Sequence, residues 1–114
     1  MSQYVTIRPA VGTWVVRAGG AVIGESRRAQ EVTEGDYPFV IYFPREDMAM
    51  AFLDTSDYRT TNPHMGEASY YSIATKNTLL KNMAWSYEAP LPEAAAIKDH
   101  IAFYVNNDIA VEQL

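Results

Sequence analysis

The sequence contains no cysteine among its 114 residues. That absence excludes disulfide bonds, a thiolate nucleophile and a zinc site built on cysteine ligands, and it is typical of proteins that stay in a reducing cytosol. The sequence also has no apolar run near the roughly 20 residues that a membrane-spanning helix needs. Residues 1–4 lack the basic start and apolar stretch of a signal peptide. We therefore expect a cytoplasmic protein without a membrane partner.

Basic residues and histidines are also scarce. The chain has 9 Lys and Arg against 14 Asp and Glu, for a net charge of −5. Nucleic-acid binding needs a surplus of positive charge to neutralise phosphates, so we expect no nucleic-acid partner. Arg27 and Arg28 could form a local basic patch, but two adjacent arginines are only a weak signal of nucleic-acid binding. His64 and His100 show no recognised metal-ligand spacing. We expect no metal and no cofactor.

The length and the spacing of apolar residues predict one β-rich domain over residues 1–114. Two independent cores would not fit into a chain this short. In residues 15–23, Gly19 and Gly20 separate two runs rich in β-branched residues, which predicts a hairpin because glycine supplies the positive φ of primed turns. The strongest predicted strand is 39–43, whose unbroken apolar character indicates burial on both faces.

The rest of the chain predicts more strands and one or two short helices. Pro44 ends the strand before it because proline has no N–H for the ladder, and the acids after it favour the start of a helix. The remaining expectations are a helix over 48–53, a polar loop over 54–63, strands over 68–75 and 78–87, a helix over 93–100 and a closing hairpin over 101–111. The predicted fold class is mainly β, with antiparallel sheets.

Five short motifs then occur in an order that resembles a known family. They are Ser-Arg-Arg-Ala at 26–29, Tyr-Phe-Pro-Arg-Glu-Asp at 42–47, Gly-Glu-Ala-Ser-Tyr at 66–70, Ala-Trp-Ser-Tyr at 84–87 and Ile-Ala-Phe-Tyr at 101–104. The series is similar to the domain of unknown function 427 family (DUF427), and the resemblance extends from Trp14 to Val111. It implies a β-tent fold similar to that of the Mss4-like proteins. Several better-known domains of that architecture carry zinc on four cysteines, which this chain lacks.

The chain departs from the family in the segment before Gly66. Many members resemble Thr-x-Cys-Pro-Tyr-Lys-Gly there, or carry histidine in place of the cysteine, whereas residues 60–66 read Thr-Thr-Asn-Pro-His-Met-Gly. Met65 cannot form an ion pair or a Schiff base, so chemistry that depends on the lysine is in doubt here. The family is also filed under a nucleotidyltransferase name. That reaction needs paired carboxylates on Mg²⁺ and a loop that cradles phosphate, and nothing in these residues supports it.

The charged motif residues have a structural and a functional interpretation. Arg27 and Arg28 point to opposite faces of an extended segment, so at most one of them enters a given pocket. One arginine could grip a carboxylate or phosphate, or it could form a salt bridge to Glu46 or Asp47. Those two acids could act in catalysis or cap a helix, with Asp47 the better cap, while Arg45 is the better candidate for reaching a ligand.

The aromatic motif residues also leave two alternatives. The predicted strand pairing brings Tyr70 close to Trp85 and Tyr87, which lie two residues apart on one face. With Tyr42 they could form a stacking cage for a planar or cationic ligand. They could equally be cross-strand packing.

Three functional hypotheses follow from these residues. The leading one is a module that binds a small molecule or peptide in a pocket formed by Arg27 or Arg28, Tyr42, Arg45, Tyr70, Trp85 and Tyr87. The alternative is a structural or protein-interaction domain without a small-molecule site. An enzyme that uses Glu46, Asp47, Glu67 or His64 as acid or base ranks last. A homodimer is a further expectation, because a small open β-fold leaves sheet edges that pairing could cover.

Overall fold

Strands make up most of the structure, a computed structural model that describes residues 4–114. The strands are β1 (Val5–Pro9), β2 (Trp14–Ala18), β3 (Ala21–Ser26), β4 (Gln30–Glu34), β5 (Val40–Pro44), β6 (Leu53–Asn62), β7 (Gly66–Ala74), β8 (Leu79–Ser86), β9 (His100–Phe103) and β10 (Ile109–Gln113). The helices within this range are short 3₁₀ segments, η1 (Arg45–Asp47), η2 (Met50–Phe52) and η3 (Pro92–Ile97). None of the helices in residues 4–114 has the length and apolar character that crossing a membrane requires.

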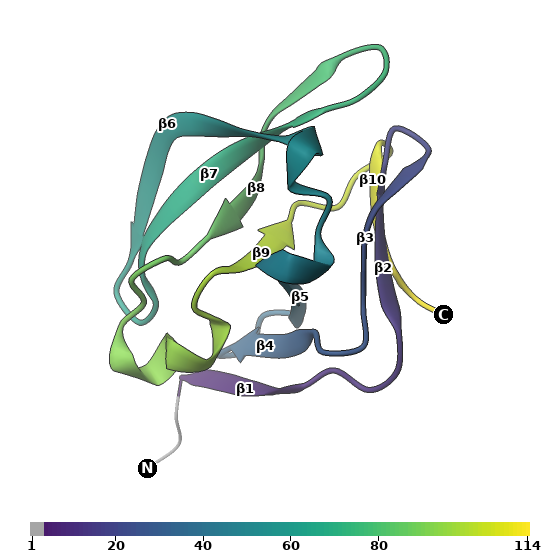
Figure 1. The fold of residues 1–114 in the computed structure, drawn as a ribbon. Coiled ribbons are helices and arrows are strands. Elements are labelled where there is room, and N and C mark those ends of the chain that lie inside the picture. Colours follow the sequence, from purple (N-terminus) through teal and green to yellow (C-terminus); the bar gives the residue numbers. More distant parts are fainter. Residues whose placement is uncertain (1–3) are drawn as a thin grey trace.

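The strands form two antiparallel sheets. The larger sheet has the order β1-β4-β5-β9-β8-β7-β6, and the smaller has the order β10-β2-β3. In Figure 1 the small sheet stands on one side of β9, and β6, β7 and β8 lie on the other. The prediction of a mainly β fold with antiparallel sheets is confirmed.

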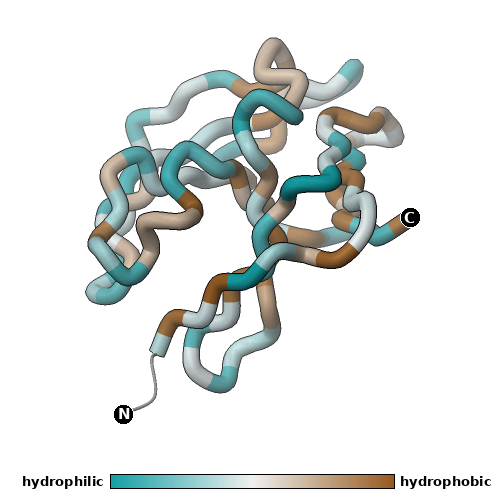
Figure 2. The backbone as a smooth tube through the Cα atoms, turned by 60° about the horizontal axis from the view of Figure 1, so that its bottom comes forward, coloured by the Kyte–Doolittle hydropathy of each residue, from teal (hydrophilic) through white to brown (hydrophobic). Residues whose placement is uncertain are grey.

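The large sheet is buried on both faces where β5 runs through it. Because side chains alternate along a strand, Ile41 and Phe43 pack in one core together with the small sheet, while Tyr42 packs in a second core together with η3. Burial of both faces is thereby confirmed for this strand, although Phe39 just before it is half exposed. Along the tube in Figure 2, hydrophobic and hydrophilic residues interchange over short distances, as strands of a layered β-fold require.

Two hairpins agree with the sequence analysis. β2 and β3 pair across Gly19 and Gly20, whose φ angles of 57° and 84° suit a primed turn. β7 and β8 pair so that Tyr70 lies opposite Trp85. The predicted closeness of these two aromatic residues is therefore confirmed.

The sequence predicts one or two helical turns over 48–53, and the structure has the single 3₁₀ turn of η2 there. Met48 before it is not helical and forms an isolated bridge with Gly24 of β3. A Cβ on residue 24 would clash with the end of the Met48 side chain, so a larger residue there would force Met48 to shift. A short helix is marginal by itself, and pairing with the small sheet decides the conformation of this segment.

The predicted polar loop over 54–63 is wrong, because residues 54–62 belong to β6. This strand is the edge of the large sheet, its register with β7 shifts between Thr55 and Arg59, and most of its side chains are exposed. An edge strand that is solvated on both faces shows no apolar alternation. Its threonines and its tyrosine favour strand over loop, and the bulge blunts the open edge.

The predicted closing hairpin over 101–111 is wrong as well. β9 inserts between β5 and β8, whereas β10 joins the small sheet beside β2. The side chain of Asn106 accepts hydrogen bonds from the N–H groups of Asp108 and Ile109 and directs the chain between the sheets. The predicted helix over 93–100 is only the 3₁₀ segment η3, followed by Asp99 at a φ of 60°. The strands that pair with β9 and β10 are distant from them in sequence, so local sequence patterns do not reveal this pairing.

Candidate functional site

Arg28 is held by the acids at the end of β5. Its Nη2 lies 3.0 Å from Oδ1 of Asp47 and 3.5 Å from Oε1 of Glu46, and the Ser26 hydroxyl donates to Asp47 Oδ2 at 2.6 Å. The hydrogen bond from Ser26, helped by Arg28, holds the pKa of the Asp47 carboxyl below its ordinary value. This contact links β3 to η1, as the structural alternative predicted. Arg27 and Arg28 are both exposed.

The prediction that Asp47 caps a helix is wrong. Neither end of η1 has a side-chain cap, because both carboxylate oxygens of Asp47 already accept hydrogen bonds from Ser26 and Arg28. A single 3₁₀ turn also offers few free N–H groups for a cap. The carboxylate therefore stabilises the contact between β3 and η1.

Arg45 lies in a separate polar cluster on the large sheet. Its Nη2 donates to the Tyr71 hydroxyl at 2.6 Å and to Glu88 Oε2 at 3.2 Å, and its guanidinium carbon lies 5.7 Å from the centre of the Tyr71 ring. The Ser69 hydroxyl donates to the other oxygen of Glu88 at 3.3 Å. The guanidinium is thus paired with groups of its own chain.

The four aromatic motif residues meet in the second core. The Trp85 indole Nε1 donates to the Tyr42 hydroxyl at 3.1 Å, and the ring centres of these residues lie 6.2 Å apart. Tyr87 stacks on Tyr42 with ring centres 6.5 Å apart, and Tyr70 lies 6.5 Å from Trp85. Burial raises the pKa of the Tyr42 and Tyr87 phenols, which stay neutral. Tyr42, Tyr70 and Tyr87 are buried, and Trp85 is half-buried.

Trp85 also lines a hollow, which we call the aromatic groove. Its volume is about 590 Å³, and its aromatic and aliphatic lining consists of Trp14, Phe39, Val40, Ile41, Trp85, Phe103, Tyr104, Val105 and Val111. It lies where β5 begins and β9 ends, so side chains from both faces of the large sheet reach it. Val40 and Trp85 belong with the second core, whereas Ile41 and Phe103 belong to the first.

The lining of the aromatic groove is uncharged, and its polar atoms are largely engaged. The Trp14 indole Nε1 donates to the Val11 carbonyl at 3.0 Å, and Trp85 donates to Tyr42. The Tyr104 ring lies 4.6 Å from Trp85, and its hydroxyl is 3.3 Å from the Tyr70 hydroxyl. Burial and the hydrogen bond with Tyr70 raise the pKa of Tyr104 to about 12. The groove therefore presents apolar surface and one neutral phenol.

The structure brings together only part of the site expected from sequence. Trp85 shares its cluster with Tyr42, Tyr70 and Tyr87, but no arginine lines the aromatic groove. Sequence reasoning missed Trp14, Phe39 and Tyr104 as lining residues. Tyr104 was the last residue of the fifth motif and therefore the one available signal. The ligand-binding role of the seven predicted residues stays a prediction.

The remaining candidates have structural surroundings. His64 stacks on Tyr4 with ring centres 4.2 Å apart, and its Nδ1 lies 2.8 Å from Glu93 Oε1. No group of three or more potential metal ligands occurs in residues 4–114. Met65 is fully buried in the second core, where an apolar side chain fits better than the ammonium of a lysine.

A family comparison agrees with the five motifs. The sequence model of the family described as Domain of unknown function (DUF427) matches residues 6–113. The chain belongs to the DUF427 family. A search of curated proteins found no match.

Proposed function

We propose that this DUF427 domain binds a small, uncharged molecule with a planar or aliphatic body in the aromatic groove. The observation that carries the proposal is the lining, in which Trp14, Phe39, Trp85 and Tyr104 surround a volume of about 590 Å³. Pockets for small ligands usually measure roughly 300–1,000 Å³ and have mostly apolar and aromatic walls. Aromatic walls favour stacking with a flat ligand.

The uncharged lining of the aromatic groove indicates an uncharged ligand. No lining residue is charged, so an ionic ligand would lose water without gaining a counter-ion. The Tyr104 hydroxyl lies beside the Tyr70 hydroxyl and can exchange hydrogen bonds with a ligand carbonyl or hydroxyl. A neutral molecule with one polar substituent matches these features.

Of the seven residues that the sequence predicts for the pocket, Trp85 lines the aromatic groove, and the other lining residues come from outside that set. Arg28 is paired with Asp47, and Arg45 with Glu88, so neither arginine is needed to hold the ligand. Tyr42 acts through Trp85, because its hydroxyl accepts the indole N–H, and Tyr87 stacks on Tyr42 from within the core. The β-tent assignment and the cytoplasmic location stay predictions.

A protein-interaction role is the second candidate, supported by the rim of the same groove. Phe39, Tyr104 and Val105 are 50%, 45% and 64% exposed. Adjacent exposed apolar side chains are typical of interaction surfaces. A second copy of this chain is the partner that fits the expected homodimer, and it would cover the groove that the first proposal leaves open.

Chemical shifts of the tryptophan indole N–H groups in the ¹⁵N-labelled protein test the small-molecule proposal. The chain has 2 tryptophans, and both line the aromatic groove, so these signals report on this site. Titration with unlabelled indole and with the cation tryptamine should give saturable shifts with indole and about tenfold weaker binding of tryptamine. Phe39→Ala should weaken indole binding, whereas Tyr37→Ala, which removes an exposed aromatic residue outside the groove, should not.

Three results would contradict the proposal. They are the absence of saturable shifts with indole, equal affinity for both probes, and equal effects of the two substitutions. Light scattering on the same samples addresses the second candidate. A dimer that Phe39→Ala or Val105→Asp converts to monomer would support it, and a monomer at every concentration tested would contradict it.

A further inference from the structure

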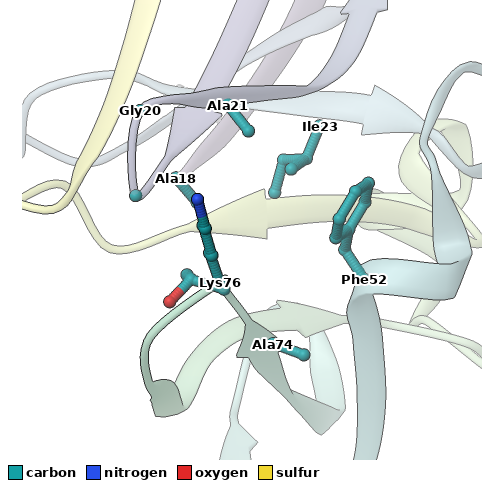
Figure 3. Close-up of a pocket in the computed structure, with 9 residues that line it drawn as sticks. Ala18, Gly20, Ala21, Ile23, Phe52, Ala74 and Lys76 are labelled. Atoms are coloured by element: carbon teal, nitrogen blue, oxygen red, sulfur yellow. The ribbon is translucent and has the colours of Figure 1, made fainter.

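A second cavity lies between two hairpin turns, and we call it the hairpin pocket. It has a volume of about 460 Å³ and lies among the β2–β3 turn, the β7–β8 turn and η2. Figure 3 shows Ile23 and Phe52 facing this space from separate elements. No lining residue is shared with the aromatic groove, so the two cavities are independent sites.

The walls of the hairpin pocket are fixed by contacts between the turns. Gly19 lies so close to Thr75 that a Cβ at residue 19 would be 3.0 Å from the Thr75 Cβ. The Gly19 N–H donates to the Asp108 carbonyl at 2.9 Å, and the Thr75 N–H donates to the Thr78 carbonyl at 2.8 Å. Both turns are therefore held in place before any ligand arrives. A preformed cavity loses little conformational entropy when it binds a ligand.

The hairpin pocket is lined by one cationic side chain and by a mainly apolar surface, which we call its floor. The floor consists of alanines with Ile23 and Phe52, and Lys76 is the single charged lining residue. In Figure 3 the Lys76 side chain runs from the β7–β8 turn toward Ala18, across the mouth of the cavity. Within residues 4–114, none of the salt bridges involves Lys76. Its charge is therefore available to a ligand.

We propose that the hairpin pocket binds a monocarboxylate with an apolar body, whose carboxylate pairs with Lys76 and whose body packs on Ile23 and Phe52. A cavity of roughly 150 Å³ accommodates benzene, so about 460 Å³ admits a ring with a short chain. A phosphate monoester carries nearly two negative charges at neutral pH, and one lysine would leave that charge partly uncompensated. A bare inorganic anion would leave the apolar floor in contact with water.

The test compares a charged and a neutral probe of the same shape, 4-phenylbutanoate and 4-phenylbutanamide. Binding is followed by chemical shifts of the ¹⁵N-labelled protein, which locate the site and give the affinity. For wild type we expect saturable shifts at Gly19, Gly20 and Thr75, with the carboxylate bound about fivefold more tightly than the amide. That ratio is reasonable for a partly solvated ion pair.

Substitution of Lys76 isolates the ion pair. Lys76→Gln should lower the affinity for the carboxylate about fivefold and leave the affinity for the amide unchanged, because only the charged probe uses the ammonium. Lys76→Arg should retain the preference for the carboxylate. Lys98→Gln changes the net charge equally at an exposed site outside the pocket, and it should leave both affinities unchanged.

Phe52→Ala tests the apolar part of the site. Phe52 is 40% exposed, so its truncation should be tolerated by the fold, and it should weaken both probes by the same factor. The proposal is overturned if neither probe binds, if both bind equally, or if Lys76→Gln and Lys98→Gln have equal effects. Shifts confined to residues of the aromatic groove would also overturn it, since they would place the probe in the other cavity.

Discussion

The Trp85 indole donates its N–H to the Tyr42 hydroxyl at 3.1 Å, and this hydrogen bond joins β8 to β5 across the intervening strand β9. It fixes the orientation of the indole that forms one wall of the aromatic groove. Tyr42 is 2% exposed, so water cannot readily replace it as the acceptor. The strength of this contact is therefore tied both to the stability of the domain and to the shape of the groove.

Replacing Tyr42 by Phe should lower the free energy of unfolding by about 1–3 kcal/mol. The change removes only the acceptor oxygen and leaves the half-buried indole N–H without its partner. Urea unfolding measures the loss. Tyr37→Phe, at a tyrosine that is 70% exposed, serves as the control and should change the stability by less than about 0.5 kcal/mol. Equal effects of the two variants would show that the hydrogen bond contributes nothing to stability.

The contribution of Asp47 to stability should depend on pH in the acid range. Its pKa is lowered in the folded protein, chiefly by the hydrogen bond from Ser26 and further by Arg28. The stability that this carboxylate contributes is therefore fully present above its pKa in the unfolded chain, about 4. It is lost as the pH falls through the lower pKa of the folded protein.

The measurement compares wild type with Asp47→Asn, a variant of the same shape, by urea unfolding from pH 7 to pH 2.5. Wild type should be more stable at pH 7, and the difference between the two proteins should shrink below about pH 4. A difference that stays constant over this range would contradict the predicted titration of Asp47.

Gly19→Ala should destabilise the domain more than Gly20→Ala. Both glycines have positive φ, of 57° and 84°, so each alanine pays a backbone cost of about 1–2 kcal/mol. A Cβ at residue 19 also meets Thr75 at 3.0 Å, whereas one at residue 20 has nothing within 4 Å. Thermal unfolding of both variants compares these effects, and an equal loss would mean that the turns adjust freely around the added methyl group.

Two buried serines should respond differently to substitution by alanine. Within the described part of the chain, Ser86 Oγ has no hydrogen-bond partner, and the residue is 0% exposed. Ser86→Ala should therefore be neutral or stabilise by up to about 1–2 kcal/mol, because it removes an unpaired buried hydroxyl. Ser72 Oγ accepts from the Asn82 N–H at 3.1 Å, and Ser72→Ala should destabilise by about 1 kcal/mol.

Denaturant unfolding of the two serine variants decides the matter. A loss of stability in Ser86→Ala as large as that in Ser72→Ala would indicate that the Ser86 hydroxyl has a partner in solution, such as a buried water molecule.

The candidate site could be predicted in part because some of its contacts are local in the chain. Tyr70 and Trp85 belong to strands joined by one short turn, so their proximity follows from the hairpin alone. The sequence also allowed a salt bridge of Arg28 with Glu46 or Asp47 as one of two alternatives, because the charges are complementary and the residues belong to successive motifs. Phe39 and Trp14 gave no such signal, since their positions in the aromatic groove depend on how β2 lies against β5.

The sequence by itself determined the family, the mainly β character and the two hairpins, since glycine turns and alternating side chains act over a few residues. Only the tertiary structure decided that 54–62 belong to an edge strand, that β9 and β10 belong to different sheets, and that Arg28 and Arg45 do not line the groove beside Trp85. Each of these depends on contacts between distant segments, where packing and pairing override the weak local preference of the chain. The aromatic groove and the hairpin pocket arise in the same way, because each is lined by elements that only the fold brings together.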